Sequence, residues 1–198
     1  PLGVSATTSN YHGFGISCHN AMDGGINVTI TGGTSAYTYA WSGPNGFASG
    51  SEDISGLEAG TYDLMVTDAN GCAASLSITL VAPPVIDATS NITTATCGGA
   101  SNGAIDLNVS GGVAPYNFAW TGPGAFSASS EDITGLSAGV YQVIITGANG
   151  CTRNFSFGVN EPGLFTVTGA LSGFNGSNVS CATSNDGEID VTVTGGTL

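Results

Sequence analysis

One long segment of this chain recurs 79 residues further along, without a gap. Cys18 corresponds to Cys97, Trp41 to Trp120, and over the aligned stretches 18–83 and 97–162, 28 of 66 positions are identical. A third copy begins at Cys181. A fixed period of this length is typical of a repeat array, so the function should be sought in what a row of copies does.

The period predicts two complete repeats, residues 1–83 and 84–162, and the N-terminal part of a third, residues 163–198. A unit of about 80 residues can bury only a modest core, and a covalent cross-link is helpful at that size. Because the chain starts without a methionine and stops within a repeat, we expect it to be a piece of a longer polypeptide. The longer second interval between repeats indicates an insertion of five residues close to Gly169–Ser177.

Composition excludes two classes of partner. The sequence has no lysine, and Arg153 is its single permanent cation against 14 carboxylates. Nucleic acid and anionic membrane surfaces would repel such a chain, because it has no cations to replace their counterions. No apolar run has the length of a membrane span, so we expect no direct membrane insertion. With 41% hydrophobic and only 8% charged residues, the chain should fold.

Cysteines occur at equal intervals of 54 residues in the two complete repeats, and the third copy contains one. Regular pairs in a small unit of this composition predict the disulfides Cys18–Cys72 and Cys97–Cys151, and hence an oxidising compartment. The alternative is free thiols packed as small apolar residues. A zinc site is less favoured, because neither of the two histidines recurs in the later copies.

Apolar residues alternate with polar ones in short segments, which predicts strands with one buried face. Ile26, Val28 and Ile30 form one such segment, and a strand ending at Trp41 follows. A tyrosine at the start of a later strand, after a leucine and a turn glycine, resembles the tyrosine corner of immunoglobulin-like domains. We therefore predict an all-β fold of tandem immunoglobulin-like antiparallel β-sandwich repeats of about 80 residues. The predicted core residues are Trp41, Tyr62, Trp120 and Tyr141.

The order of motifs within one copy resembles the SprB repeat of Bacteroidetes surface adhesins. The motifs are Cys, Asp/Asn-Gly, an alternating strand, Gly-Gly, Tyr-x-Tyr/Phe-x-Trp, Glu-Asp-Ile-Ser/Thr-Gly-Leu, Ala-Gly-x-Tyr, Asp/Gly-Ala-Asn-Gly-Cys and a closing proline. The resemblance implies a very large secreted cell-surface protein, exported by the type IX route and associated with gliding motility and attachment. Asp68 becomes Gly147 in the second copy, which argues against a functional carboxylate there in every unit.

Candidate chemistry is sparse. The repeated pairs Glu52-Asp53 and Glu131-Asp132 are adjacent on a strand and so point to opposite faces, which suits no acid/base pair. We expect no catalytic residues and no enzyme activity. Calcium is the cofactor to consider, because acidic extracellular modules bind it through carboxylates. The candidate ligands are Asp23, Asp68, Asp186, Glu188 and Asp190. A solvated strand face is the simpler account of these carboxylates.

These patterns favour a non-catalytic, disulfide-stapled stalk segment of an extracellular, outer-membrane-associated adhesin or filament. Its expected partners are other repeats of the same long chain. The alternatives are a glycan- or calcium-binding module, and a polymerising filament subunit that a neighbouring copy completes by strand addition. In the partial third copy, the strand expected at Glu188–Thr194 has nothing to pack against, so we expect a mobile tail after about Pro162 in an isolated chain.

Overall fold

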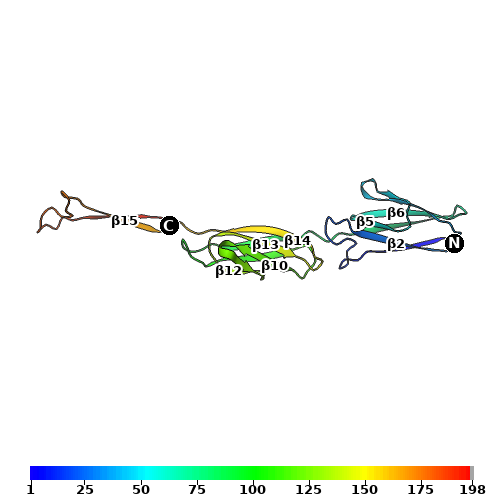
Figure 1. Cartoon of the computed structure of the whole chain (residues 1–198), viewed down its shortest axis with the longest axis horizontal. Helices are drawn as coiled ribbons and strands as arrows, with labels where there is room; N and C mark the ends of the chain where they lie inside the picture. Colours follow the sequence, from blue (N-terminus) through cyan, green and yellow to red (C-terminus); the bar gives the residue numbers. More distant parts are fainter. Residues whose placement is uncertain (197–198) are drawn as a thin grey trace. The chain divides into compact units, whose positions relative to one another are not determined.

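The computed structural model describes residues 1–196, which form β-strands, turns and two single-turn 3-10 helices (Figure 1). The first repeat contains β1 (Gly3–Thr8), β2 (Gly24–Thr31), β3 (Thr38–Ser42), β4 (Ala48–Ser49), β5 (Ile54–Leu57), β6 (Gly60–Thr67) and β7 (Ala73–Leu80), with the 3-10 turn η1 (Pro44–Gly46). The second contains β8 (Asp87–Thr93), β9 (Gly103–Ser110), β10 (Asn117–Gly122), β11 (Phe126–Ala128), β12 (Ile133–Leu136), β13 (Gly139–Thr146) and β14 (Thr152–Val159), with η2 (Pro123–Ala125). The third contains β15 (Thr166–Leu171) and β16 (Ile189–Thr194). Within the described residues there is no helix long and apolar enough to cross a bilayer.

The chain divides into two compact units, and the border between them runs through the second repeat. Unit 1 comprises residues 1–89, 108–118 and 144–154, and unit 2 comprises residues 90–107, 119–143 and 155–198. The division of the sequence into repeats at residues 83 and 162 stays a prediction.

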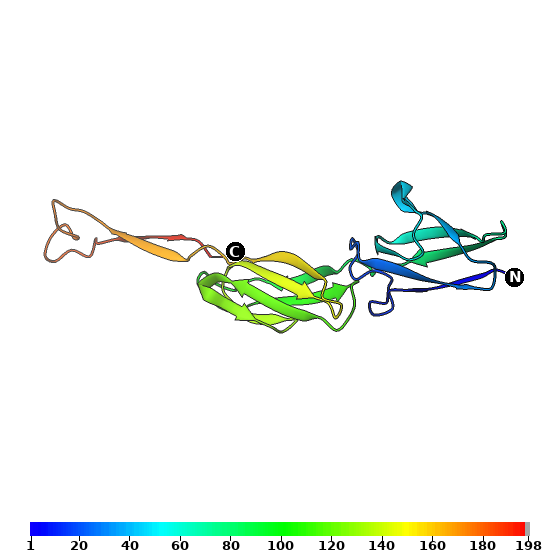
Figure 2. The same ribbon diagram turned by 45° about the vertical axis from the view of Figure 1, so that its right-hand side comes forward.

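The first repeat is a sandwich of two antiparallel sheets with the strand orders β1-β2-β5 and β4-β3-β6-β7. Figure 2 shows them as a blue layer containing β1 and β2 and a teal layer containing β6 and β7. Taken in chain order, the strands reproduce the A-B-E and C′-C-F-G sheets of immunoglobulin domains, with the fourth strand of the first sheet missing. The alternation in β2 decides which face is buried: Ile26 and Val28 point inward, and Asn27 is exposed.

Two aromatic side chains anchor this core. Trp41 on β3 and Tyr62 on β6 are 3% and 1% exposed. Each satisfies its polar atom on the backbone, since Trp41 Nε1 donates to Ser51 O at 3.0 Å and Tyr62 Oη donates to Glu58 O at 3.1 Å. The latter bond is a tyrosine corner. Gly43 must be glycine, because a Cβ there would lie 2.6 Å from the ring of Tyr62.

The second repeat has the same strand orders, β12-β9-β8 and β11-β10-β13-β14. Trp120 and Tyr141 are buried at the positions that correspond to Trp41 and Tyr62. Trp120 Nε1 donates to Ser130 O at 3.0 Å, and Tyr141 Oη donates to Ser137 O at 3.0 Å. The fold is therefore all-β and immunoglobulin-like in both complete repeats, as the sequence predicts.

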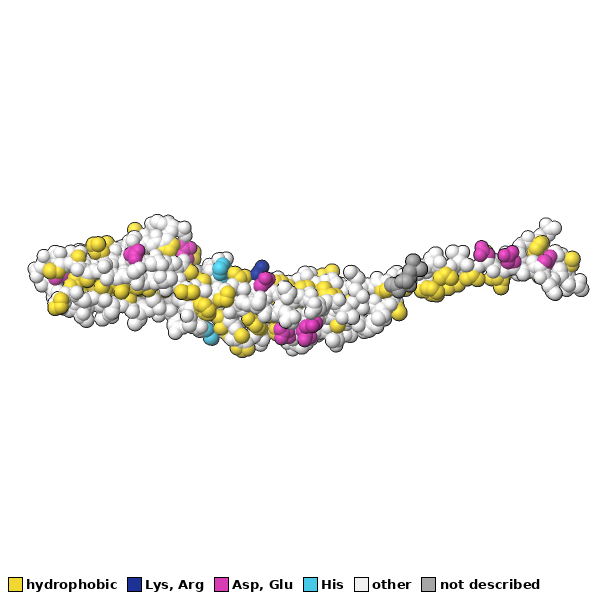
Figure 3. Space-filling view, turned by 180° about the vertical axis from the view of Figure 1, so that it is seen from behind, with side chains coloured by type: hydrophobic (Ala, Val, Ile, Leu, Met, Phe, Trp, Pro, Cys, Tyr) yellow, Lys and Arg dark blue, Asp and Glu magenta, His cyan; other side chains and the backbone are white. Residues whose placement is uncertain are grey.

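The third copy is a single antiparallel hairpin in which β15 pairs with β16 from Thr166↔Thr194 to Leu171↔Ile189. Its strands are exposed throughout, and Figure 3 shows hydrophobic side chains along one side of the hairpin and acidic ones on the other. Its inserted residues form a tight turn in which Phe174 pairs with Ser177, and the first repeat has the same turn at Tyr11↔Phe14.

Candidate functional site: the two cysteine turns

The structure contains one disulfide, and it joins the first repeat to the second. Cys18 is bonded to Cys151, with 5.7 Å between their Cα atoms and 133 residues of sequence separation. Cys72, Cys97 and Cys181 are free and exposed. The predicted pairs Cys18–Cys72 and Cys97–Cys151 are therefore wrong, and the free thiols are not packed in a core.

The geometry of the first sandwich explains the error. Gly15 N donates to Val81 O at 2.8 Å, which holds the segment leading to Cys18 at the C-terminal end of β7. Cys72 immediately precedes the N-terminal end of the same strand. Eight residues of strand at about 3.3 Å each separate the two ends by about 26 Å, whereas a disulfide needs Cα atoms within about 7 Å.

Cys18 lies in a turn that we call the first-cysteine turn, residues 17–23. Ser17 N donates to Asp23 Oδ1 at 3.0 Å, and Ala21 N donates to Cys18 O at 2.9 Å. The other copies repeat both bonds: Thr96 N to Asn102 Oδ1 (3.0 Å), Ala100 N to Cys97 O (3.0 Å), Ser180 N to Asp186 Oδ1 (3.0 Å) and Ser184 N to Cys181 O (3.1 Å). All three copies thus hold their first cysteine in the same local structure.

Two of the calcium candidates close this turn. Hydrogen bonds from the side chain and backbone of Ser180 and from Ser184 lower the pKa of Asp186 to about 2. Burial raises the pKa of Asp23, but hydrogen bonds from Ser17 outweigh it and hold that pKa below its ordinary value. Because the uncharged Asn102 occupies the same place in the second repeat, this position caps the turn without needing a negative charge.

Cys72 and Cys151 lie in a different structure, the second-cysteine turn, residues 68–72 and 147–151. In the first repeat Asp68 N donates to Cys72 O and Gly71 N donates to Asp68 O, both at 2.9 Å. In the second, Gly147 N donates to Cys151 O and Gly150 N to Gly147 O, again at 2.9 Å. The two copies of this turn therefore present their cysteines alike.

Asp68, another calcium candidate, has its carboxylate occupied by backbone donors. Oδ1 accepts from Cys72 N and Asn70 N, both at 2.9 Å, and Oδ2 accepts from Thr34 N at 3.0 Å. The hydrogen bond from Cys72, followed by that from Thr34, lowers the pKa of this carboxyl group. Asp68 is thus a structural residue of the first repeat, and Gly147 has no counterpart to this network.

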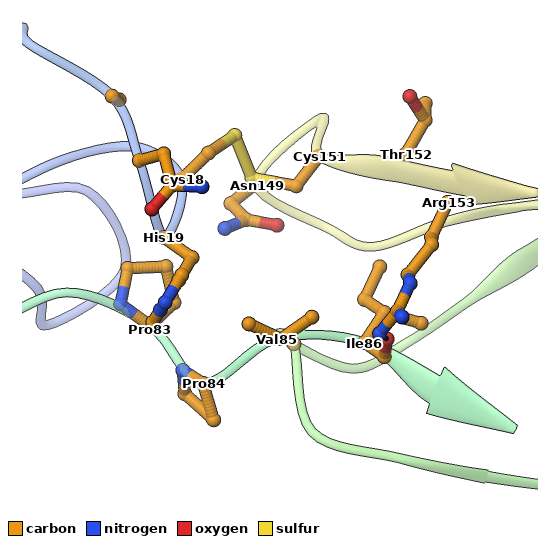
Figure 4. A pocket seen from close by; sticks show the side chains of 13 residues that line it. Cys18, His19, Pro83, Pro84, Val85, Ile86, Asn149, Cys151, Thr152 and Arg153 are labelled. Atoms are coloured by element: carbon orange, nitrogen blue, oxygen red, sulfur yellow. Dashed lines mark hydrogen bonds between the residues drawn. A yellow bond between two sulfur atoms is a disulfide. The ribbon is translucent and has the colours of Figure 1, made fainter.

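The bonded cysteines lie beside a cavity of about 420 Å³ within unit 1 (Figure 4). Asn149 Nδ2 donates to Ser17 O at 2.6 Å, which links the two turns a second time. Arg153 Nη1 donates to Ile86 O at 2.7 Å and lies 3.9 Å from Asp87 Oδ1. The arrangement supplies a covalent cross-link with hydrogen bonds around it. It presents neither an acid/base pair nor a nucleophile with its base.

The other acidic positions do not converge either. Asp53 Oδ1 accepts from Val28 N at 2.8 Å, and Asp132 Oδ1 accepts from Leu107 N at 2.8 Å, so the repeated aspartates fasten one strand to the next. Glu188 and Asp190 are exposed at the start of β16. In residues 1–196, no three His, Cys, Asp or Glu side chains lie close enough together to hold a metal ion.

Comparison with known proteins identifies the repeat. No curated protein matches the sequence. Similar solved structures include Dscam in "Structural basis for Dscam isoform specificity" (14% identity, 81% of this chain and 46% of that chain, TM-score 0.34) and the amphioxus IgVJ-C2 molecule (16% identity, 78% and 96%, TM-score 0.32). The chain thus spans about half of the Dscam structure. The family described as SprB repeat matches residues 16–46, 89–125 and 173–198. One match falls in each of the three copies, and the chain belongs to the SprB repeat family.

Proposed function

We propose that this chain is a non-catalytic stalk segment of a secreted cell-surface adhesin, in which covalent bonds join successive repeats. The observation that carries the proposal is the Cys18–Cys151 disulfide, because it connects two sandwiches rather than stapling one. A bond in that position adds nothing to a binding pocket or an active centre. It does resist extension of the chain.

The bond limits how far the chain can be drawn out. A pull on the two ends passes from Cys18 to Cys151 through the sulfur atoms, so the residues between them bear no load while the bond is intact. On the chain-entropy model, closing a loop of this size also stabilises the folded state by about 4–5 kcal/mol. Both effects suit a segment that holds a cell to a surface under tension.

The composition supports an extracellular location. Disulfides persist outside the reducing cytosol, and a chain with one arginine and no lysine offers trypsin-like proteases a single cleavage site. Type IX export and a part in gliding motility, as in the SprB adhesins that the motifs resemble, belong to this proposal.

Single-molecule pulling from the two termini tests the mechanical role. With the disulfide intact, only residues outside 18–151 should extend. After reduction the fully stretched chain should be longer by up to about 480 Å, at about 3.6 Å per residue. The matched control is Cys151→Ser, which should give the longer extension with or without reductant. Equal extension of the oxidised and reduced parent chains would contradict a load-bearing cross-link.

A second candidate function is assembly through the β15–β16 hairpin. Its apolar side chains are exposed: Leu164, Phe165, Val167, Leu171, Ile189, Val191 and Val193. A neighbouring copy that covers this face would make the chain a filament subunit. Concentration-dependent mass by light scattering, abolished by Val191→Asp, would support assembly, and a monomer at all concentrations would contradict it.

A further inference from the structure

The three free cysteines fall into the same two classes as the bonded ones. Cys97 and Cys181 occupy first-cysteine turns, like Cys18, and Cys72 occupies a second-cysteine turn, like Cys151. The one bond in the structure joins a member of each class, taken from consecutive repeats. Its separation of 133 residues is the 54 residues between two cysteines of a repeat plus the 79-residue period.

The surroundings of Cys97 also resemble those of Cys18. Beside Cys18, Val85 from the segment that follows the first repeat lines the same cavity as His19. The residues one period later are Leu164 and Gly98, and they too are in contact, since a Cβ at Gly98 would lie 3.0 Å from Leu164 Cδ2. The segment that leads into the next repeat thus packs against the turn at both places.

We propose that every such bond in an array joins the first cysteine of one SprB repeat to the second cysteine of the next. Cys97 then pairs with the second cysteine of a following repeat, and Cys72 with the first cysteine of a preceding one. This inference rests on the proposed stalk function and names the partner of each exposed thiol. The array becomes a ladder of overlapping covalent loops, each spanning parts of two repeats.

The chemistry is ordinary thiol–disulfide exchange in an oxidising compartment. The Cys97 thiolate attacks a protein or small-molecule disulfide, and the partner thiolate then displaces that carrier from the mixed disulfide. One Sγ–Sγ bond forms between the repeats, the two thiols lose two protons and two electrons, and the carrier disulfide is reduced to two thiols. The exposure of Cys97 and Cys72 gives the carrier access to both.

An extended chain tests the pairing directly. Residues 164–198 align with residues 1–35, so a copy of residues 36–83 appended after Leu198 completes a third repeat and adds one cysteine, a copy of Cys72. The parent chain has three free thiols. The extended chain, with six cysteines, should form two disulfides and keep two free thiols, those of Cys72 and Cys181. Peptide mapping without reductant should find Cys97 bonded to the added cysteine.

Two results would overturn the proposal. One is a bond between Cys181 and the added cysteine, which would show pairing within a repeat. The other is a reduced Cys97 in an extended chain whose third repeat is folded, as judged by hydrogen-exchange protection of residues 189–194. Pulling experiments on the parent chain do not depend on either outcome, so failure of the ladder and failure of the stalk function are distinguishable.

A second variant needs no added repeat. In the parent chain with Cys151→Ser, the proposed rule leaves Cys18 without a partner, so four free thiols should be titrated instead of three. A new Cys18–Cys72 bond in this variant would leave two free thiols. That result would overturn the rule even if the extended chain failed to fold.

Discussion

The β1–β2 hairpin of the first repeat and the β15–β16 hairpin of the third are the same structure in different surroundings. Both pair six residues of an N-terminal strand with a second strand in matching register, Thr8↔Ile26 in one and Leu171↔Ile189 in the other. Ile26 is fully buried, whereas Ile189 is 67% exposed. The comparison teaches that pairing alone defines these strands, and that the burial of their apolar face comes from a second sheet.

That second sheet is β4-β3-β6-β7, which brings Trp41, Leu64 and Val66 against Ile26 and Val28 in one buried cluster. The hairpin of the third copy has no such sheet among residues 1–196. The following substitutions should therefore have large effects in the first repeat and small ones in the hairpin.

Trp41→Ala should have the largest effect, because it removes the biggest side chain of the first core. We expect a loss of about 3–5 kcal/mol from the free energy of unfolding of the first repeat, measured by urea denaturation. The hairpin should keep its hydrogen-exchange rates, since it makes no use of this side chain. An unchanged denaturation midpoint would show that the two sheets do not depend on the indole.

Ile26→Ala and Ile189→Ala form a matched pair at equivalent positions. The first should cost about 2–5 kcal/mol, because it leaves a cavity between the sheets. The second should change stability by no more than about 0.5 kcal/mol, because the side chain is already in solvent. Equal losses in thermal denaturation would mean that something covers the hairpin in solution, and the comparison would fail.

Acidification should loosen the first repeat through Asp68. A carboxyl group whose pKa is lower in the folded state stabilises the fold above its unfolded pKa, and this contribution is lost as the pH falls through the folded value. We therefore expect stability to fall below about pH 4. Asp68→Asn should reduce that pH dependence, because an amide cannot accept all three backbone hydrogen bonds. A pH profile identical to that of the parent would contradict this role.

The smallest effect should come from the caps of the first-cysteine turns. The pKa of Asp186 is about 2, so the Ser180 amide should shift in an NMR titration only as the pH falls from about 4 towards 2. The Ser17 amide should respond to Asp23 below its ordinary range in the same way. The Thr96 amide faces the uncharged Asn102 and serves as the control. A shift at Thr96 equal to those at the serines would exclude the caps as its cause.

Much of the fold could be predicted from the sequence because it depends on local alternation. The strand expected at Val85–Ile92 is β8, Asp87–Thr93, and the one expected at Glu188–Thr194 is β16, Ile189–Thr194. The tyrosine corner follows from a short motif around Tyr62, and its hydrogen bond to Glu58 O is present. Each of these predictions needed only residues that are close together in the chain.

The disulfide could not be assigned in this way, because a strict repeat makes all cysteine spacings regular. Intervals of 54 and 133 residues recur equally well, and only the position of Cys18 at one end of β7 and Cys72 at the other separates them. The roles of Asp53 and Asp68 were missed for a similar reason. Their hydrogen bonds reach Val28 and Thr34, residues far away in the sequence.

Peptide mapping of the oxidised chain without reductant tests the central claim most directly. Cleavage after glutamate and after Arg153 places Cys18 in residues 1–52, Cys72 and Cys97 in residues 59–131, and Cys151 in residues 132–153. The structure predicts that peptide 1–52 is linked to peptide 132–153 and that peptide 59–131 runs alone. A link between peptides 1–52 and 59–131 would place the bond inside the first repeat and contradict a covalent connection between repeats.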